Sequence, residues 1–293
     1  MSNPDISWNP SDGSTVGQLA ELVAACERAE GIELPIDVDD AGPTDARTLL
    51  TATEAGRLIA AASLPDDPEP EAIVLVHPDH RRRGIGRQIV QELLAEVQRR
   101  GLTELTLICD ERSPSGPPFL VAIGAERASA EYRLAATAAD LDRSRPRIDG
   151  LTLRKATEDD QEALVDVLAA SFGQDRSESE ERVDAGLAET RRAFYLGLLD
   201  GQPVAALKAG GWERDAGITA FGVLPSHQGR GIGRQLLLDA ADLLAAEGWP
   251  RILIEVDIDN APAVALYRNT GFHVVTTYGY YTLGTGYEVR STK

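Results

Sequence analysis

The stretch HQGRGIGRQ, at residues 227–235, repeats the earlier stretch HRRRGIGRQ, at residues 80–88, and differs from it at only two positions. Each copy follows an apolar run that is typical of a β-strand and ends at a proline. Each copy also precedes a run with the apolar periodicity of an amphipathic helix. The offset of 147 residues (223 − 76) holds without a gap from Val76–Asp110 to Val223–Asp257. This period is far longer than that of a solenoid repeat, so the chain is a duplicated domain.

Both copies predict the same order of elements. In the second copy we expect strands at 151–156, 217–225 and 251–257, a hairpin at 194–210 with its turn at Asp200-Gly201, a closing hairpin at 272–283, and helices at 159–170, 177–190, 235–247 and 261–269. In the first copy we expect strands at 6–8, 71–78 and 105–110, a hairpin at 48–63, and helices at 15–28 and 87–100. This pattern predicts an α/β (α+β) fold: two tandem domains, each a mixed, mostly antiparallel sheet with helices on both faces. The expected boundaries are residues 1–136, a polar linker at 137–150, and residues 151–293.

The glycine turn predicts an anion site. The first N–H groups of a helix lack intrahelical partners and carry the positive end of its dipole, and glycines allow a ligand to approach the backbone. Arginines beside the turn add phosphate donors, so a pyrophosphate is the expected ligand. A Walker loop is excluded because neither copy has its lysine, and a Rossmann fingerprint is excluded because Arg234 stands where its third glycine would fall. The remaining alternative is a tight turn with solvated arginines.

Composition narrows the class of partner. The net charge is −18 and aromatic residues make up only 5% of the chain, so nucleic acid and anionic membranes are not expected partners, whereas a cationic acceptor is compatible. The two cysteines, Cys26 and Cys109, form neither a disulfide framework nor a metal-ligand pattern, and no metal is expected. The N-terminal residues lack the features of a signal peptide, and no apolar run is long enough to span a bilayer. We therefore expect a cytoplasmic protein.

The stretch VLPSHQGRGIG, followed by NAPAVALYRNTGF at 260–272, resembles the GNAT superfamily of N-acetyltransferases, whose acyl-CoA loop has the pattern Q/R-x-x-G-x-G/A after a strand. The resemblance covers residues 151–283 and, more weakly, residues 1–136. It implies acetyl-CoA, or another acyl-CoA, as donor substrate. In the second copy it implies a strand and loop that bind this donor, comprising Phe221, Gly222, Val223, Gln228, Gly229, Arg230, Gly231, Ile232, Gly233 and Arg234, with Asn260 beyond them. The matching residues of the first copy are Val76, Arg81, Arg82, Arg83, Gly84, Ile85, Gly86 and Arg87.

Acyl transfer to an amine requires that the amine lose a proton, that the carbonyl oxygen be stabilised, and that the thiolate be helped to leave. The resemblance implies that the backbone N–H of Val223 stabilises the oxygen and that Tyr267 is the acid, although a tyrosine at helical spacing is also a common packing residue. For the base we favour Glu255, which interrupts an otherwise apolar strand and matches a glutamate of the ribosomal-protein N-terminal alanine acetyltransferases. The alternative is that Glu255 is a solvated edge residue, and Asp215 and Glu213 are reserve candidates.

The first copy keeps the loop but not these groups. Ile108 stands opposite Glu255, Ser113 opposite Asn260 and Leu120 opposite Tyr267, and Ser-Pro and Pro-Pro steps are expected to spoil the start of the corresponding helix. We therefore expect the first domain to be non-catalytic, with its binding of CoA open.

The leading hypothesis is an acetyl-CoA-dependent N-acetyltransferase that acts on a primary amine of a small molecule or a peptide N-terminus by direct attack on the thioester. One alternative is a non-enzymatic acyl-CoA-binding module. A second is a mycothiol synthase-type enzyme that acetylates a cysteinyl pseudodisaccharide, whose architecture fits, although the usual glutamate of that family corresponds to Gly217 here. Either a monomer with an internal pseudo-dimer or a homodimer is compatible with the repeat.

Overall fold

The computed structural model describes residues 4–10, 13–36, 48–212 and 214–286. By its internal contacts the chain divides into two compact units: residues 1–131 together with 276–293, and residues 132–275. These units differ from the boundaries expected from the repeat at two places. Residues 276–286 of the second copy belong to the first unit, and the second unit begins within the last strand of the first copy. Both units have the mixed architecture expected from the sequence.

The first unit contains two sheets and three helices among its described residues. One sheet has the order β1-β2-β3-β5, and the other strands of the unit follow the order β4-β6-β13. The strands are β1 (Asp5–Pro10), β2 (Thr48–Glu54), β3 (Arg57–Leu64), β4 (Glu71–Ala72), β5 (Val74–Val76), β6 (Glu104–Asp110), and parts of β7 (Glu126–Ala136) and β13 (His273–Gly284). The helices are α1 (Gly13–Glu30), α2 (Ile85–Arg99) and α3 (Gly116–Ala122), with a short 3-10 turn, η1 (Pro78–His80). Helix α1 packs with Leu49 and Leu58, whereas α2 packs with Leu50 and Ile59, so the two helices cover opposite faces of the first sheet.

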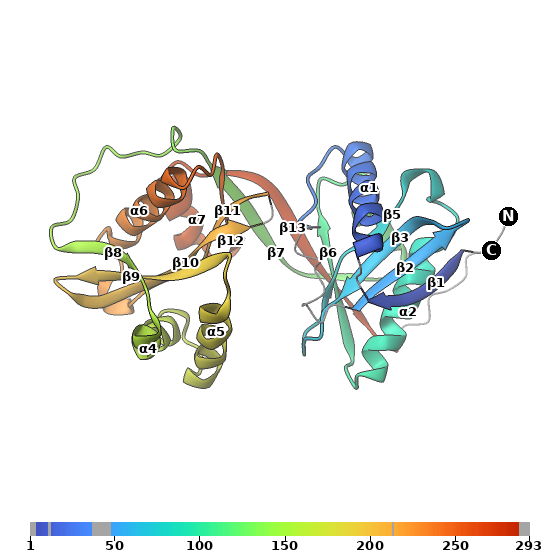
Figure 1. Ribbon diagram of the computed structural model, residues 1–293, viewed down its shortest axis with the longest axis horizontal. Helices are drawn as coiled ribbons and strands as arrows, with labels where there is room; N and C mark the ends of the chain where they lie inside the picture. The colour runs from blue at the N-terminus through green and yellow to red at the C-terminus, as the bar shows by residue number, and fades with distance from the viewer. Residues whose placement is uncertain (1–3, 11–12, 37–47, 213, 287–293) are drawn as a thin grey trace. The chain divides into compact units, whose positions relative to one another are not determined.

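The second unit has one sheet with the order β7-β12-β11-β10-β9-β8. Its further strands are β8 (Leu151–Lys155), β9 (Arg192–Leu199), β10 (Gln202–Trp212), β11 (Asp215–Val223) and β12 (Ile252–Asp257). Its helices are α4 (Gln161–Phe172), α5 (Arg176–Ala188), α6 (Ile232–Ala246) and α7 (Ala261–Arg268), with 3-10 turns η2 (Glu158–Asp160) and η3 (Pro225–His227). In Figure 1, α4 and α5 lie on one side of this sheet and α6 and α7 on the other. The alternation of Phe194 and Tyr195 between the two cores agrees with this arrangement.

The repeat survives in the structure residue by residue. Helix α6 begins and ends 147 residues after α2, and η3 begins and ends 147 residues after η1 (232 − 85, 246 − 99 and 225 − 78). The expected turn at Asp200-Gly201 is confirmed, because both residues have the positive φ angles, 50° and 81°, that a tight hairpin of this kind requires.

One expectation about local structure is wrong. Residues 272–283 do not form a hairpin; β13 is one twelve-residue strand, whose second half pairs antiparallel with β6 from Tyr278 to Gly284. The prolines of the first copy act at the start of its helix, as expected: α3 begins two residues later than α7, since Ala261 corresponds to residue 114. The helix still forms, because its prolines then occupy the first turn, where no backbone donor is needed.

Residues 137–150, which were expected to be a free linker, are fastened along α6 of the second unit. The Arg147 guanidinium pairs with Asp239 at 2.7 Å, Arg143 pairs with Asp242, and the N–H of Ile148 donates to the side chain of Gln235 at 2.6 Å. The segment is therefore an ordered part of the second unit.

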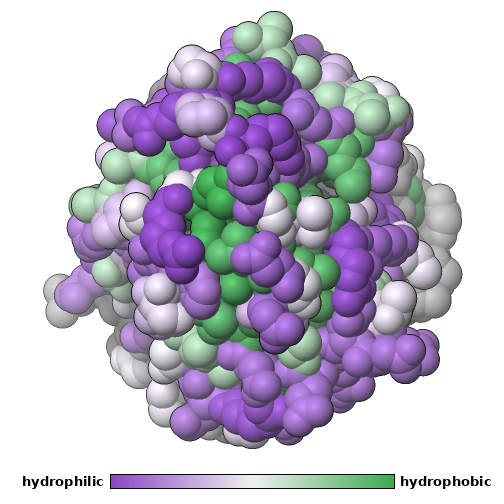
Figure 2. Space-filling view, turned by 90° about the vertical axis from the view of Figure 1, so that its left-hand side faces the viewer, coloured by the Kyte–Doolittle hydropathy of each residue, from purple (hydrophilic) through white to green (hydrophobic). Residues whose placement is uncertain are grey.

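The surface that Figure 2 faces is mostly hydrophilic, with a hydrophobic strip near its centre. Among the described residues, no helix combines the length and the apolar character needed to cross a membrane.

Candidate active site

In both units the strand before the glycine loop separates from its parallel neighbour. Strand β11 pairs with β12 only at Ala216 and Gly217, and β4 pairs with β6 only at Glu71 and Ala72. Beyond these pairs β11 continues against β10, and β5 continues against β3. Beyond these pairs, the parallel side of each strand no longer pairs with its neighbour, and we refer to this separation of the two strands as the gap of each unit.

The separation in β11 coincides with a bulge at Ala220. This residue has a φ of 46°, and the register against β10 shifts between Ala206 and Lys208. A bulge bends the strand and re-aims its backbone, and bulges are frequent beside functional sites. Phe221, Gly222 and Val223, which were expected to bind the acyl donor, follow directly after it.

The two glycine loops have the same backbone. Gly84 and Gly231 precede α2 and α6 with φ angles of 82° and 84°, in the left-handed region that disfavours a residue with a Cβ. The first bonds into these helices are the Gln88 N–H to the Gly84 carbonyl and the Gln235 N–H to the Gly231 carbonyl, both at 3.1 Å. The three amides after each glycine, at Ile85–Arg87 and Ile232–Arg234, precede these bonds. Each loop therefore presents the amide cradle that suits a pyrophosphate.

The side chain of the first residue of each motif ties the loop to the strand before it. Gln228 Nε2 donates to the Val223 carbonyl at 2.9 Å, and Arg81 Nε donates to the Val76 carbonyl at 3.0 Å. These are equivalent bonds, 147 residues apart, that tie the end of the strand to the start of the loop.

Several of the expected cationic side chains already have protein partners. Arg83 binds both carboxylate oxygens of Glu54, at 2.6 and 3.1 Å. Buried Arg234 donates through Nη2 to the carbonyl and carboxylate of Asp142, at 2.6 and 2.7 Å, while its Nε and Nη1 have no hydrogen-bond partner among the described residues. Arg87 donates to the Ala122 carbonyl at 3.0 Å, and Arg230 is exposed.

Glu255 lies on β12 and forms an ion pair. Its Oε1 accepts a hydrogen bond from Arg133 Nε at 2.7 Å, and its side chain is 21% exposed, so the carboxylate is partly accessible. The Arg133 guanidinium in turn lies 5.1 Å from the centroid of the Trp212 ring. The ring fills the space beside Gly217, because a Cβ there would lie 2.1 Å from Trp212 Cε3. A glutamate at residue 217 therefore does not fit this structure, and Glu255 is the carboxylate at the gap.

Tyr267 lies on α7 in the core of the second unit. Only 6% of it is exposed, its ring is 6.4 Å from that of Phe272, and burial raises the pKa of its phenol to about 12. It therefore packs as a core aromatic and also remains a protonated donor at neutral pH. Asn260 caps α7, since its Oδ1 accepts the Ala263 N–H at 3.2 Å.

Neither of the two reserve candidates for the base, Asp215 and Glu213, gains support from the structure. Asp215 is buried and bound by Arg251 through Nε at 3.0 Å and Nη2 at 2.6 Å, so its carboxylate is committed to a structural pair. Glu213 lies outside the described residues.

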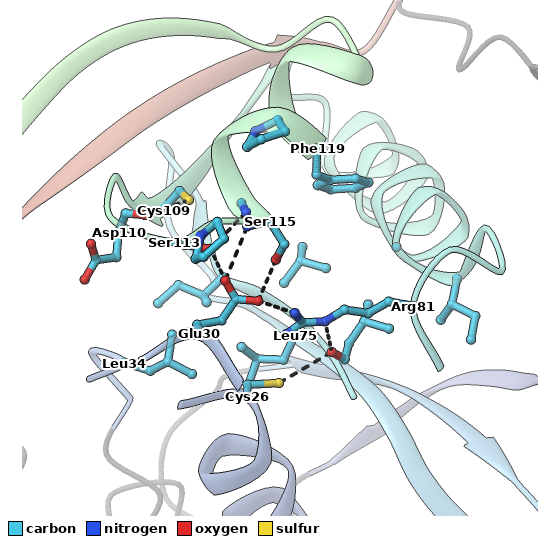
Figure 3. A pocket seen from close by; sticks show the side chains of 18 of the residues that line it. Cys26, Glu30, Leu34, Leu75, Arg81, Cys109, Asp110, Ser113, Ser115 and Phe119 are labelled. Carbon is cyan, nitrogen blue, oxygen red and sulfur yellow. Dashed lines mark hydrogen bonds and ion pairs between the residues drawn. The ribbon is translucent and has the colours of Figure 1, made fainter. Parts of the chain in front are cut away.

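The first unit contains a cavity of about 820 Å³ beside its glycine loop. Figure 3 shows Glu30, at the end of α1, in the centre of this cavity wall. Its carboxylate accepts hydrogen bonds from Ser113 Oγ at 2.7 Å, from Ser115 Oγ at 2.8 Å and from Arg81. Burial raises the pKa of Glu30, but the hydrogen bonds outweigh it, so that the net pKa lies below the ordinary value. This carboxylate is held ionised and saturated with donors, which makes it a poor base.

No sequence pattern singled out Glu30, because its partners Ser113 and Ser115 lie 83 and 85 residues away in the chain. Neither cysteine that lines the cavity is an activated nucleophile. Burial raises the pKa of the Cys109 thiol to about 12 and also raises that of Cys26. Ser113, at the position of Asn260, makes the equivalent bond, because its Oγ accepts the Gly116 N–H at 2.9 Å as Asn260 accepts that of Ala263, although the residue directly before α3 is Ser115. Within the described part of the chain, no group of three or more His, Cys, Asp or Glu residues could hold a metal ion.

Parallel strands that separate before a glycine loop, with a helix dipole behind it, are the arrangement that the resemblance to acyl-CoA-dependent acyltransferases leads us to expect. Comparison with known proteins agrees. The model of the acetyltransferase (GNAT) family matches residues 18–115 and 161–272, and the chain belongs to this family.

Its relatives include mycothiol acetyltransferases. That of Clavibacter michiganensis is 30% identical over 245 residues, covering 79% of this chain and 78% of the relative. That of Saccharomonospora viridis is 31% identical over 234 residues, covering 73% and 74%. The expected enzyme class, an acyltransferase, is thereby confirmed.

Solved structures share the fold. A GCN5-related N-acetyltransferase from Sphaerobacter thermophilus has a TM-score of 0.80 at 20% identity and covers 96% of both chains. A tandem GNAT protein from the clavulanic acid biosynthesis pathway has a TM-score of 0.75 at 22% identity and covers 97% of this chain and 99% of its own. The expected tandem arrangement of the fold is confirmed.

Proposed function

We propose that the second unit transfers an acetyl group from acetyl-CoA to a primary amine by direct attack, and that the first unit does not catalyse. The observation that carries this proposal is the asymmetry of the two gaps. Glu255 and Tyr267 occupy β12 and α7 of the second unit, whereas Ile108 and Leu120 occupy the equivalent positions of the first. Apolar side chains cannot move a proton.

In this proposal three groups of the second unit each serve one requirement of the acyl transfer. The Glu255 carboxylate accepts a proton from the attacking amine, either directly or through water. The N–H of Val223, released from β12 by the separation of the strands, donates to the carbonyl oxygen as negative charge develops on it. The Tyr267 phenol, with its pKa of about 12, donates a hydrogen bond to the departing sulfur. Acetyl-CoA supplies the activated acyl group.

The first unit retains a site for acyl-CoA. Its loop has the backbone of the second loop, and its cavity of about 820 Å³ is in the range of pockets that enclose a cofactor. Glu30 does not replace the missing base, since its carboxylate is already bound by Ser113, Ser115 and Arg81. We therefore expect two molecules of CoA to bind per chain, one of which does not react.

For the acceptor, the relatives named mycothiol acetyltransferase favour a cysteinyl amine, and the acidic chain favours a cation. Mycothiol synthases usually have a glutamate at the position of Gly217, whereas here the Trp212 ring fills the space beside this glycine. The wall of the acceptor site therefore carries an indole ring in place of a carboxylate. A peptide N-terminus is the second candidate, because Glu255 is the residue shared with the alanine acetyltransferases.

The test supplies acetyl-CoA as the donor and compares three acceptor amines: S-methylcysteine amide, a tetrapeptide that begins with alanine, and the cysteinyl pseudodisaccharide. Acetylated product is measured by mass spectrometry, because the pseudodisaccharide thiol would react with a reagent for free CoA. We expect Glu255→Gln to lower kcat by about a hundredfold or more. The matched control, Glu247→Gln, changes an exposed glutamate of the same unit and should leave kcat unaltered.

If Glu255→Gln acetylates as fast as the parent, the assigned base is wrong. If no amine is acetylated while CoA binds, the non-enzymatic binding module is the better description.

A further inference from the structure

Arg133 is the partner of the proposed base, and nothing in the glycine motif points to it. Only 5% of Arg133 is exposed. Its Nε lies 2.7 Å from Glu255 Oε1, and its Cζ is 5.1 Å from the Trp212 ring centroid. A buried guanidinium is costly unless it is paired, so the ion pair and the aromatic ring both contribute to holding this group where it lies.

Trp212 is itself held in place. Its ring occupies the space that a side chain at residue 217 would need, with Cε3, Cδ2 and Cβ at 2.1, 2.8 and 3.0 Å from the Cβ position. Gly217 is one of the last residues of β11 that still pair with β12. The ring, the guanidinium and the carboxylate therefore form a row that starts at the point where the two strands separate.

Arg133 belongs to β7, the strand that ends the first copy of the repeat, yet it lies in the second unit. Its partner Glu255 is 122 residues further along the chain. The site of the second copy is thus completed by a residue that the second copy does not encode.

We propose that Arg133 is a positioning residue for Glu255: it fixes the orientation of the carboxylate and keeps it ionised, so that the last strand of the first copy contributes to the active site of the second. This inference rests on the proposed function, in which Glu255 receives the proton of the amine. The guanidinium is suited to the task because its Nε–H can bind the carboxylate while its Cζ lies 5.1 Å from the centre of the Trp212 ring, and a lysine has no planar group that could do both.

The test compares Arg133→Gln, Arg133→Lys and Trp212→Leu in the full chain. Arg268→Lys is the control. The Arg268 guanidinium lies 5.5 Å from the ring of Tyr132, which neighbours Arg133 on β7, but Arg268 itself is exposed and does not bind Glu255. We expect Arg133→Gln to lower kcat at least tenfold, with KM for acetyl-CoA within about twofold of the parent. Arg133→Lys and Trp212→Leu should lie between Arg133→Gln and the parent, and Arg268→Lys should match the parent.

Two further readouts separate positioning from folding. An opposite charge within hydrogen-bond distance lowers a carboxyl pKa by roughly one to three units. The acidic limb of kcat/KM should therefore move to higher pH by about one unit or more in Arg133→Gln. The ¹³C titration of the Glu255 carboxyl, assigned by comparison with Glu255→Gln, should move in the same direction.

The outcomes are distinguishable. If Arg133→Gln lowers only the unfolding temperature and leaves kcat, the acidic limb and the ¹³C titration unaltered, Arg133 has a structural role alone and the inference is wrong. Should Arg133→Gln not fold, the same criteria apply to Arg133→Lys and Trp212→Leu. If the ¹³C titration moves but Glu255→Gln is fully active, the proposed base fails, and the positioning role fails with it. A moved titration with an inactive Glu255→Gln supports both.

Discussion

The matched pair Gly84→Ala and Gly231→Ala measures which glycine loop serves turnover. The two glycines have φ angles of 82° and 84°, so an added Cβ meets the same backbone strain in both units. Left-handed backbone costs such a residue about 1–2 kcal/mol. Crowding does not distinguish the two sites, because a Cβ at residue 84 meets nothing within 4 Å and one at residue 231 meets only Ile148 Cδ1, at 3.7 Å.

The expected loss of kcat/KM follows from the hydrogen bonds that the backbone strain would remove. If the loop relaxes, the amides of Ile232–Arg234 turn away from the pyrophosphate. A hydrogen bond to a charged group contributes about 1.5–3 kcal/mol, and each 1.36 kcal/mol is a factor of about ten. Loss of one such bond in Gly231→Ala should lower kcat/KM for acetyl-CoA by roughly ten- to a hundredfold. Gly84→Ala should leave it within about twofold of the parent.

The assay is acetylated product by mass spectrometry at varied acetyl-CoA, with the best acceptor of the panel. Calorimetry counts the CoA bound per chain, for which we expect two in the parent and one tight site in each variant. Unfolding temperatures should fall equally in both variants, which removes stability as the explanation. An equal loss of kcat/KM in Gly84→Ala and Gly231→Ala would refute the assignment of catalysis to the second unit alone.

Three further changes have expected results. Tyr267→Phe keeps the packed ring and removes only the phenol, so kcat should fall about a hundredfold while the unfolding temperature hardly moves; an unchanged kcat would leave Tyr267 as a packing residue. Hydrogen bonds from Ser144, followed by the Arg234 guanidinium, lower the pKa of Asp142 to about 2 from 3.8 in a free side chain. Its stabilisation is therefore present above about pH 4 and lost as the pH falls through about 2, so thermal melts of parent and Asp142→Asn should differ near neutral pH and converge in acid. Gly217→Ala places a Cβ 2.1 Å from the Trp212 ring and should destabilise the protein by about 1–3 kcal/mol in urea unfolding, whereas an unshifted midpoint would show that the ring moves freely.

The fold could be predicted where local signals decide it. Glycine at the left-handed position before a helix, proline at a strand end and the alternation of apolar residues are properties of a few neighbouring residues, and α2 and α6 lie where the repeat places them. The prolines of α3 act where the sequence predicts, at the start of the helix, which begins two residues later than α7 and keeps its prolines in the first turn; a proline further along would break it.

The path of the last strand could not be predicted in this way. Residues 272–283 contain two apolar stretches around Gly279, and a hairpin and one long strand satisfy this pattern equally. The choice depends on pairing with β6, more than 160 residues earlier in the chain (278 − 110 = 168), which no local pattern encodes. The same limit applied to the site. The sequence indicated Glu255 as a polar residue in an apolar strand, but its pairing with Arg133 depends on which strand lies beside β12.

The unit boundaries change what the duplication means. If each copy were an independent domain, loss of function in the first copy would leave it free to decay without consequence for the second. Each unit instead contains chain from both copies: residues 276–286 lie with the first unit, and residues 132–136 lie with the second. If the second unit is the catalytic one and Arg133 positions its base, as we propose, selection on that site acts on β7 of the first copy, and β13 of the second copy pairs with β6. On this proposal a non-catalytic first copy can persist on these grounds alone, and its intact glycine loop requires the separate reason that CoA binding would supply.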